Sequence, residues 1–330
     1  MDEIGVTAAP EPGIKIITEK QCFSRIGMAY FVMTAITIGL QLVGGVVLVL
    51  AAPEAGVGSW QFWAASFIPM YCVAVPACIA MMRRVPSRAP ETHRLGCGRF
   101  WVCLLMCIGI MYTGNLIGVC LMNLVGALRG APVDSSLDLM LENSSLFMNF
   151  LVTVLLAPAI EELLFRKLLI DRTRQFGEGL AVVLSGVLFG LFHGNFYQFF
   201  YACGLGFLLA YLYVRTGRLR YPVALHMIIN FMGAVIAPLV LRVTERLDLE
   251  DPAAVLQVLP QMLWVSLYGF AILGSAVAGV VLVIVNIKKF RVGAGECPLP
   301  RGHRFGTVFG NVGMILFLVS IVCMFVFNFI

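Results

Sequence analysis

The chain has 330 residues, of which 60% are apolar and only 12% charged, and its formal net charge is +5. Soluble domains carry about 25% charged and about 45–50% apolar residues, so this composition excludes a soluble enzyme, a disordered chain and a nucleic-acid binder. The apolar stretches are long and continuous, which predicts an all-α, polytopic transmembrane helical bundle rather than a β-barrel with its short alternating segments.

Hydropathy predicts about nine spans in a single domain. The polar residues 1–25 are predicted to form a cytoplasmic N-terminal segment that is not a cleavable signal peptide. Transmembrane helices are expected over residues 26–145, a central core over 146–240 and further transmembrane helices over 241–330. The predicted spans are residues 26–52, 60–82, 100–126, 147–170, 179–195, 196–214, 221–241, 262–287 and 308–330.

The distribution of basic residues predicts how the chain is oriented. If the N-terminus is cytoplasmic, only Arg129, Arg242 and Arg246 of the 23 Lys and Arg fall in outer segments. This asymmetry follows the positive-inside rule, so the net positive charge reflects topology and anionic inner-leaflet lipid rather than a nucleic-acid partner. We therefore expect a multi-pass cell-membrane protein whose C-terminus, after nine spans, lies outside.

Ionisable side chains inside the predicted spans are few and concentrate in three of them. Such residues are costly in a membrane and are usually functional. The Glu162–Arg166 pair is four residues apart, so the two side chains share a helix face and Arg166 is expected to orient and neutralise Glu162. The polar set and one neighbouring aromatic residue are Glu161, Glu162 and Arg166 in the fourth span, Phe189 and His193 in the fifth, and His226 and Asn230 in the seventh.

Distances along the chain predict that these side chains lie at one depth. Glu161 and His193 are equally far from the turn predicted at Gly177, about 24 Å each along a helix. The polar stretch before this turn is expected to protrude from the membrane, which puts both residues roughly 10 Å below the cytoplasmic surface. His226 follows the turn at Arg220 by about six residues and falls at a similar depth. One cluster near the cytoplasmic side is therefore expected.

The chemistry of this set fits hydrolysis. Glu161 with His193 would take a proton from water, and His226 with Asn230 would stabilise the developing oxyanion. The same region could instead hold a zinc ion through Glu161, His193 and His226, with an open position for water. The chain has no HExxH motif and no GxSxG motif, which argues against a zincin and a serine hydrolase.

Three motifs in this region resemble those of the CPBP family, the CAAX proteases and bacteriocin-processing enzymes that are also called Abi proteins. The resemblance covers about residues 146–240 and implies that they form the catalytic core of an intramembrane endopeptidase, related to the type II CAAX prenyl endopeptidase. The family's substrates do not carry over; we expect a membrane-associated peptide or protein, cleaved near the cytoplasmic side where the spacing places the cluster. The motifs are EExxxR (Glu161, Glu162, Arg166), FxxxH (Phe189, His193) and HxxxN (His226, Asn230).

The resemblance also implies roles for the motif residues. Glu161 would be the water-activating base assisted by His193, with Glu162 beside it, and His226 and Asn230 would be the oxyanion stabilisers. Arg166 and Phe189 would orient and pack these groups. Family members are described both as metalloproteases and as metal-free enzymes, so the resemblance leaves zinc binding open.

Three other functions are compatible with parts of the pattern. A non-catalytic CPBP-like scaffold or immunity protein would keep the motifs without hydrolysis. A proton-coupled transporter would use intramembrane Glu and His as a relay, although the chain lacks the inverted repeats typical of such folds. A b-type haem protein would use His193 and His226 as axial ligands, but this leaves Glu161 without a role.

Overall fold

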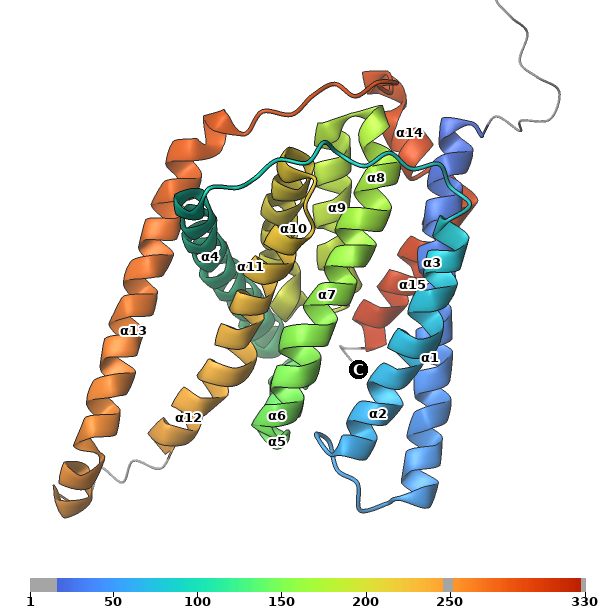
Figure 1. Cartoon of the computed structure of the whole chain (residues 1–330). Helices are drawn as coiled ribbons and strands as arrows, with labels where there is room; N and C mark the ends of the chain where they lie inside the picture. The colour runs from blue at the N-terminus through green and yellow to red at the C-terminus, as the bar shows by residue number, and fades with distance from the viewer. Residues whose placement is uncertain (1–16, 246–251, 328–330) are drawn as a thin grey trace, which may run out of the picture.

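The computed structural model describes residues 17–245 and 252–327, and these residues form helices and connecting loops without any β-strand (Figure 1). The all-α helical bundle expected from composition is therefore confirmed. The N-terminal part consists of α1 (Glu19–Ala51), α2 (Trp60–Ile68), the π-helix η1 (Pro69–Ala74), α3 (Val75–Met82) and α4 (Cys97–Arg129).

The central part contains one long helix that alternates between α and π geometry, followed by three shorter helical segments. The long helix comprises α6 (Leu146–Met148), the π-helix η2 (Asn149–Leu156), α7 (Ala157–Glu162), the π-helix η3 (Leu163–Leu168), α8 (Leu169–Thr173) and the 3₁₀ turn η4 (Arg174–Phe176). Before it lies α5 (Ser136–Asn143), and after it come α9 (Glu178–Phe192), α10 (Phe196–Thr216), α11 (Arg220–Phe231), the π-helix η5 (Met232–Ile236) and α12 (Ala237–Glu245).

The C-terminal part packs on both sides of this centre. Helix α13 leans on α4, and α15 packs along α1 (Figure 1). Its elements are α13 (Pro252–Asn286), the 3₁₀ turns η6 (Ile287–Lys289) and η7 (Arg301–His303), α14 (Arg304–Val308) and α15 (Val312–Phe327).

The number of spans differs in detail from the nine expected. Seven described helices are long and apolar enough to cross a membrane, and the pair Arg301–Val308 and Val312–Phe327, bent by 65°, makes eight if it is one span. Helix α9, predicted as the fifth span, has 15 residues, and its length of about 22 Å falls short of a hydrocarbon core of about 30 Å. Nine spans and an outside C-terminus stay predictions.

The first helix begins earlier than expected. Helix α1 starts at Glu19 rather than near residue 26, because Thr18 and Gln21 form a reciprocal capping box at 3.1 and 3.3 Å. The extra turns bury Phe23 against Phe176 at a ring distance of 5.3 Å. Residues 1–16 of the predicted N-terminal segment lie outside the described residues.

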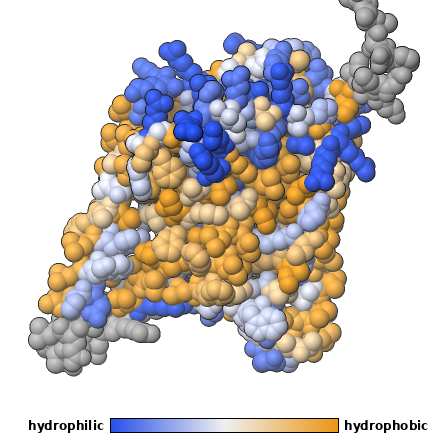
Figure 2. All heavy atoms as spheres, in the orientation of Figure 1, coloured by the Kyte–Doolittle hydropathy of each residue, from blue (hydrophilic) through white to orange (hydrophobic). Residues whose placement is uncertain are grey.

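Basic connections gather at one end of the molecule, which we call the basic end. It comprises the loop 83–96, the α8–α9 turn, the α10–α11 turn and the connection 287–303 (Figure 1). Figure 2 shows hydrophilic residues concentrated at this end above an apolar middle. Within the described residues, the opposite end carries only Arg129 and Arg242 as basic residues. The predicted alternation of basic and non-basic connections between successive helices is thus present. The side of the membrane that the basic end faces stays a prediction.

The largest core cluster fixes the long central helix in place. It joins buried side chains of α1, α3, η3, α9 and α15. The hydroxyl of Tyr30, which is fully buried, donates to the carbonyl of Leu164 at 2.9 Å, and its ring stacks on Phe165 at 5.5 Å. Phe165 in turn meets Phe189 edge to face at 5.5 Å. These contacts set the rotation of the helix that carries Glu161 and Glu162.

Candidate active site

Glu161 lies in the middle of the long helix Leu146–Phe176. It is equally far from both ends, about 22 Å along the helix axis. Its side chain is 15% exposed, while that of the adjacent Glu162 is fully buried. The two neighbouring carboxylates therefore have different environments, one reaching a cavity and the other enclosed by protein.

Pro158 has a structural consequence one turn before the glutamates. In the π-helix η2 the N–H of Ala157 donates to the carbonyl of Val152, so the next donor in this register would be residue 158. Proline has no N–H, which leaves the carbonyl of Thr153 without its helical partner. The side-chain Nδ2 of Asn230 donates to this carbonyl at 2.9 Å. Asn230 is thereby tied to the glutamate-bearing helix.

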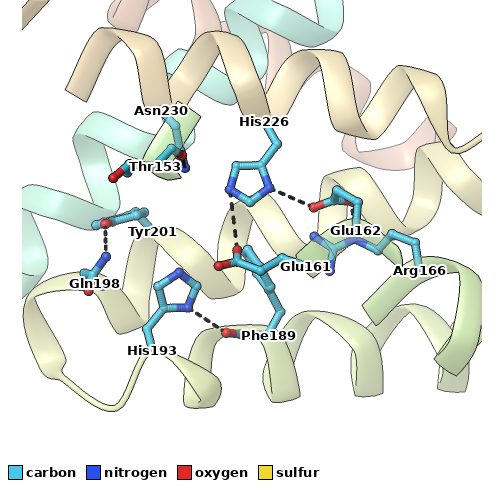
Figure 3. Close-up of polar contacts among 10 residues, drawn as sticks. All are labelled: Thr153, Glu161, Glu162, Arg166, Phe189, His193, Gln198, Tyr201, His226 and Asn230. Carbon is cyan, nitrogen blue, oxygen red and sulfur yellow. Dashed lines mark hydrogen bonds and ion pairs between the residues drawn. The ribbon is translucent and has the colours of Figure 1, made fainter. Parts of the chain in front are cut away.

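His226 contacts both glutamates (Figure 3). Its Nδ1 is 2.9 Å from Glu162 Oε1, and its Nε2 is 3.8 Å from Glu161 Oε2. An ionised carboxylate only accepts hydrogen bonds, so Nδ1 carries a proton in this contact, and in the neutral tautomer Nε2 would present a lone pair toward Glu161. A distance of 3.8 Å is too long for a direct hydrogen bond. A water molecule that donates one O–H to each acceptor would satisfy both.

Arg166 balances the charge of the buried glutamate. Its Nε lies 2.9 Å from Glu162 Oε2, and both side chains are completely buried. Its guanidinium also sits over the ring of Phe189, 4.4 Å from the centroid. None of its three guanidinium nitrogens has a partner in hydrogen-bond geometry among the described residues, so charge attraction to Glu162 and the aromatic face are the main compensation for burying this cation.

His193 stands at the end of α9 on the other side of Glu161. Its Nδ1 donates to the carbonyl of Phe189 at 2.8 Å, which directs Nε2 away from the helix. Phe189 meets the rings of both histidines edge to face, at 4.9 Å for His193 and 5.5 Å for His226. Figure 3 shows the two imidazoles facing the carboxylate of Glu161 from different helices.

These side chains line a cavity of about 380 Å³. Glu161, His193, His226 and Asn230 contribute to its wall, whereas Glu162 and Arg166 lie behind it. The spacing argument is thus right that the three motifs meet.

The cavity extends from Glu161 and His226 away from the basic end. Its further lining comes from α5, which includes the exposed Asp138, from the end of α11, from η5 and from Ala237 at the start of α12 (Figure 1). The sequence predicts a cluster near the cytoplasmic side. The lining of the cavity reaches from Glu161, in the middle of its helix, toward the opposite end, and the depth of the cluster below the cytoplasmic surface stays a prediction.

Sequence reasoning missed two polar residues of the cavity. Tyr201 lines the wall, and its hydroxyl accepts a hydrogen bond from Gln198 Nε2 at 2.9 Å, leaving its own O–H to donate. Gln198 in turn accepts from Asn195, the N-cap of α10, at 2.7 Å. The sequence contains a pattern that could have indicated them, because Asn195, Gln198 and Tyr201 are spaced by three in a largely apolar segment directly after His193.

A three-ligand metal site does not assemble from the predicted residues. Among the described residues, no three His, Cys, Asp or Glu side chains come close enough together to hold a metal ion. The predicted ligands Glu161, His193 and His226 are of the right type, and both histidines have the second-shell hydrogen bonds that metal ligands usually have. Their arrangement nevertheless does not fit zinc, so we derive no chemistry through a metal.

Comparison with known proteins agrees with the motifs. A family model described as type II CAAX prenyl endopeptidase Rce1-like matches residues 143–232. A Bacillus subtilis protein named "Putative membrane peptidase YdiL" is 33% identical over 84 residues, which are 24% of this chain and 33% of that protein. The match thus spans about a third of the relative's length. No solved structure matches the chain significantly.

Both matches point to the same family as the motifs do. The family model covers the whole segment that carries the two glutamates, the arginine, both histidines and Asn230. The resemblance of the central region, residues 143–232, to the CPBP family of CAAX proteases is therefore confirmed.

Proposed function

We propose that this membrane protein is an intramembrane endopeptidase in which Glu161 is the general base that activates water. The observation that carries the proposal is the facing pair of Glu161 Oε2 and His226 Nε2, 3.8 Å apart on the wall of a cavity. Two acceptors at this separation hold a water molecule in a defined orientation. Glu162 positions His226 through Nδ1, and Arg166 pairs with the other carboxylate oxygen of Glu162.

The proposed step is hydrolysis of a peptide bond. Glu161 removes a proton from the water molecule. The oxygen of this water attacks the carbonyl carbon of the substrate, and the carbonyl oxygen becomes an oxyanion. The C–N bond then breaks, and the proton on Glu161 passes to the leaving nitrogen. Asn230 has a second Nδ2 hydrogen that is not used by Thr153, and this hydrogen would donate to the oxyanion.

The contacts favour a different pairing of the histidines from the one inferred from sequence. The sequence-based interpretation couples Glu161 to His193 and assigns His226 to the oxyanion. His226 is the histidine that contacts Glu161 and Glu162, whereas the hydrogen bond of His193 is to Phe189. We therefore propose that His226 orients the water with Glu161. Asn230 would donate to the oxyanion, and His193 lines the same cavity.

We further propose that a membrane-associated peptide or protein reaches the site from the end opposite the basic loops. The lining of the cavity extends to Asp138 and Ala237 at that end, and the positive-inside rule assigns the basic end to the cytoplasm. An epitope tag inserted in the loop 130–135 should bind antibody on intact cells, and one in the loop 83–96 should bind only after permeabilisation. The reverse labelling would contradict the proposal that the substrate reaches the site from the side opposite the cytoplasm.

The experiment that tests proteolysis compares cells that produce the wild type with cells that produce Glu161→Gln at matched membrane level. Peptides or new protein termini present with the wild type should vanish with the variant, because Gln cannot accept the proton of the attacking water. Glu54→Gln, an exposed acidic residue in a loop, is the matched control and should keep every product. Identical profiles from wild type and Glu161→Gln would favour the scaffold or the proton-coupled transporter.

A further inference from the structure

A second cavity, which we call the basic-end cavity, lies between α4, α10 and α13. Its volume is about 610 Å³, and it shares no lining residue with the cavity at Glu161. Four cationic side chains form its rim at the level of the basic loops. They are Arg94, Arg99, Arg215 and Lys289.

No carboxylate in the described part of the chain balances the charge on this rim. Arg94, Arg99 and Arg215 are exposed, and none forms an ion pair with a carboxylate of the described residues. Lys289 donates to the neutral Asn286 at 2.9 Å. No Asp or Glu lines the cavity. The rim therefore attracts an anion from outside the chain.

Below the rim the wall is apolar. Met106 on α4 and Leu208 on α10 are buried side chains that line it, and Val102 beside them is 37% exposed. Tyr211 and Phe290 close the wall with an edge-to-face contact at 4.8 Å. Both α4 and α10 belong to helices of membrane-spanning length. A ligand that fills this cavity thus needs an anionic head and an apolar body.

We infer that the basic-end cavity binds an anionic phospholipid. Its phosphate would lie against the guanidinium groups of Arg94, Arg99 and Arg215, which hold phosphate oxygens in bidentate geometry. One acyl chain would run along Val102 and Met106. Basic pockets between transmembrane helices on the cytoplasmic side bind anionic lipid headgroups in this way. The inference does not depend on the proposed proteolytic function.

The test measures lipid binding to the purified full chain by native mass spectrometry, with dioleoyl phosphatidylglycerol and dioleoyl phosphatidylcholine as probes. The wild type should prefer phosphatidylglycerol, and the triple variant R94Q/R99Q/R215Q should bind it roughly 100-fold more weakly, at about fivefold per arginine. The matched control R83Q/R84Q/R301Q removes three exposed arginines of the basic end that do not line the cavity. It should keep the affinity within about threefold.

Two results would overturn the inference. An equal loss of affinity in both triple variants would mean that the surface charge of the basic end, and not this cavity, attracts the lipid. Full competition by glycerol 3-phosphate at the same concentration would mean that the site takes a free phosphate rather than a lipid.

A second measurement keeps the test valid if the triple variant does not fold. A photoreactive benzoylphenylalanine in place of Val102, in an otherwise wild-type chain, should crosslink phosphatidylglycerol in preference to phosphatidylcholine from a mixture of equal parts. The same residue in place of Val183, which is 56% exposed on α9 and outside the cavity, should show no preference. No preference at Val102 would contradict a headgroup-selective site.

Discussion

Replacing Arg166 with Met should destabilise the protein strongly, because it leaves the carboxylate of Glu162 buried without a counter-charge. The two charged atoms are 2.9 Å apart with both side chains at 0% exposure, and two unit charges at that distance attract by about 6 kcal/mol at an effective dielectric constant of about 20. Proton uptake by Glu162 would relieve part of the loss. We therefore expect the free energy of unfolding to fall by about 3–5 kcal/mol.

The double variant Glu162→Gln with Arg166→Met separates the charge effect from the loss of packing. It removes both buried charges and keeps most of the volume, so it should recover most of the stability that the single variant loses. Reversible unfolding in mixed detergent–SDS micelles measures the free energies, and Arg83→Met, which replaces an exposed arginine, is the control. If Arg166→Met unfolds like the wild type, or the double variant is no more stable than the single one, the buried ion pair is not the stabilising contact described above.

Three further predictions test the site and its packing. Asn230→Ala should lower the cleavage rate by roughly 10²–10³-fold if Asn230 is an oxyanion donor. It should also leave the Thr153 carbonyl unpaired. An unchanged rate in a peptide-release assay would contradict the donor role. Gly206→Ala should cost about 1–3 kcal/mol of unfolding free energy, because a Cβ would lie 2.8 Å from the Gly186 backbone; Gly269→Ala, which meets nothing within 4 Å, is its control. Cleavage should survive dialysis against 1,10-phenanthroline, since no metal enters the proposed step; loss of activity that zinc restores would overturn that step.

Much of the site could be predicted because ionisable residues stand out in apolar spans. The spacing of four residues between Glu162 and Arg166 predicts their contact directly from helical geometry. In the structure Arg166 Nε lies 2.9 Å from Glu162 Oε2. Equal chain distances from Gly177 bring Glu161 and His193 to one level. These relations hold within one helix or one hairpin, where the rise per residue sets the distance.

The rest depended on how helices rotate and tilt against one another. Whether His226 reaches both glutamates depends on the rotation of α11, and that rotation is set by side-chain packing and by π-helical turns that no periodicity signals. The link from Asn230 to Thr153 likewise requires the π register that Pro158 interrupts. Composition could not show that α9 stops after 15 residues.

Sequence alone therefore determined the helical membrane architecture, the alternation of basic loops and the residues of the cluster. The free energy gained by burying apolar side chains in lipid and the cost of placing charges there both depend on residue type, which can be read directly from the sequence. The direction of the cavity at Glu161 and the existence of the basic-end cavity were decided only by the tertiary structure. Both are spaces left between helices from distant parts of the chain, and their shape follows from contacts that form only when those helices pack.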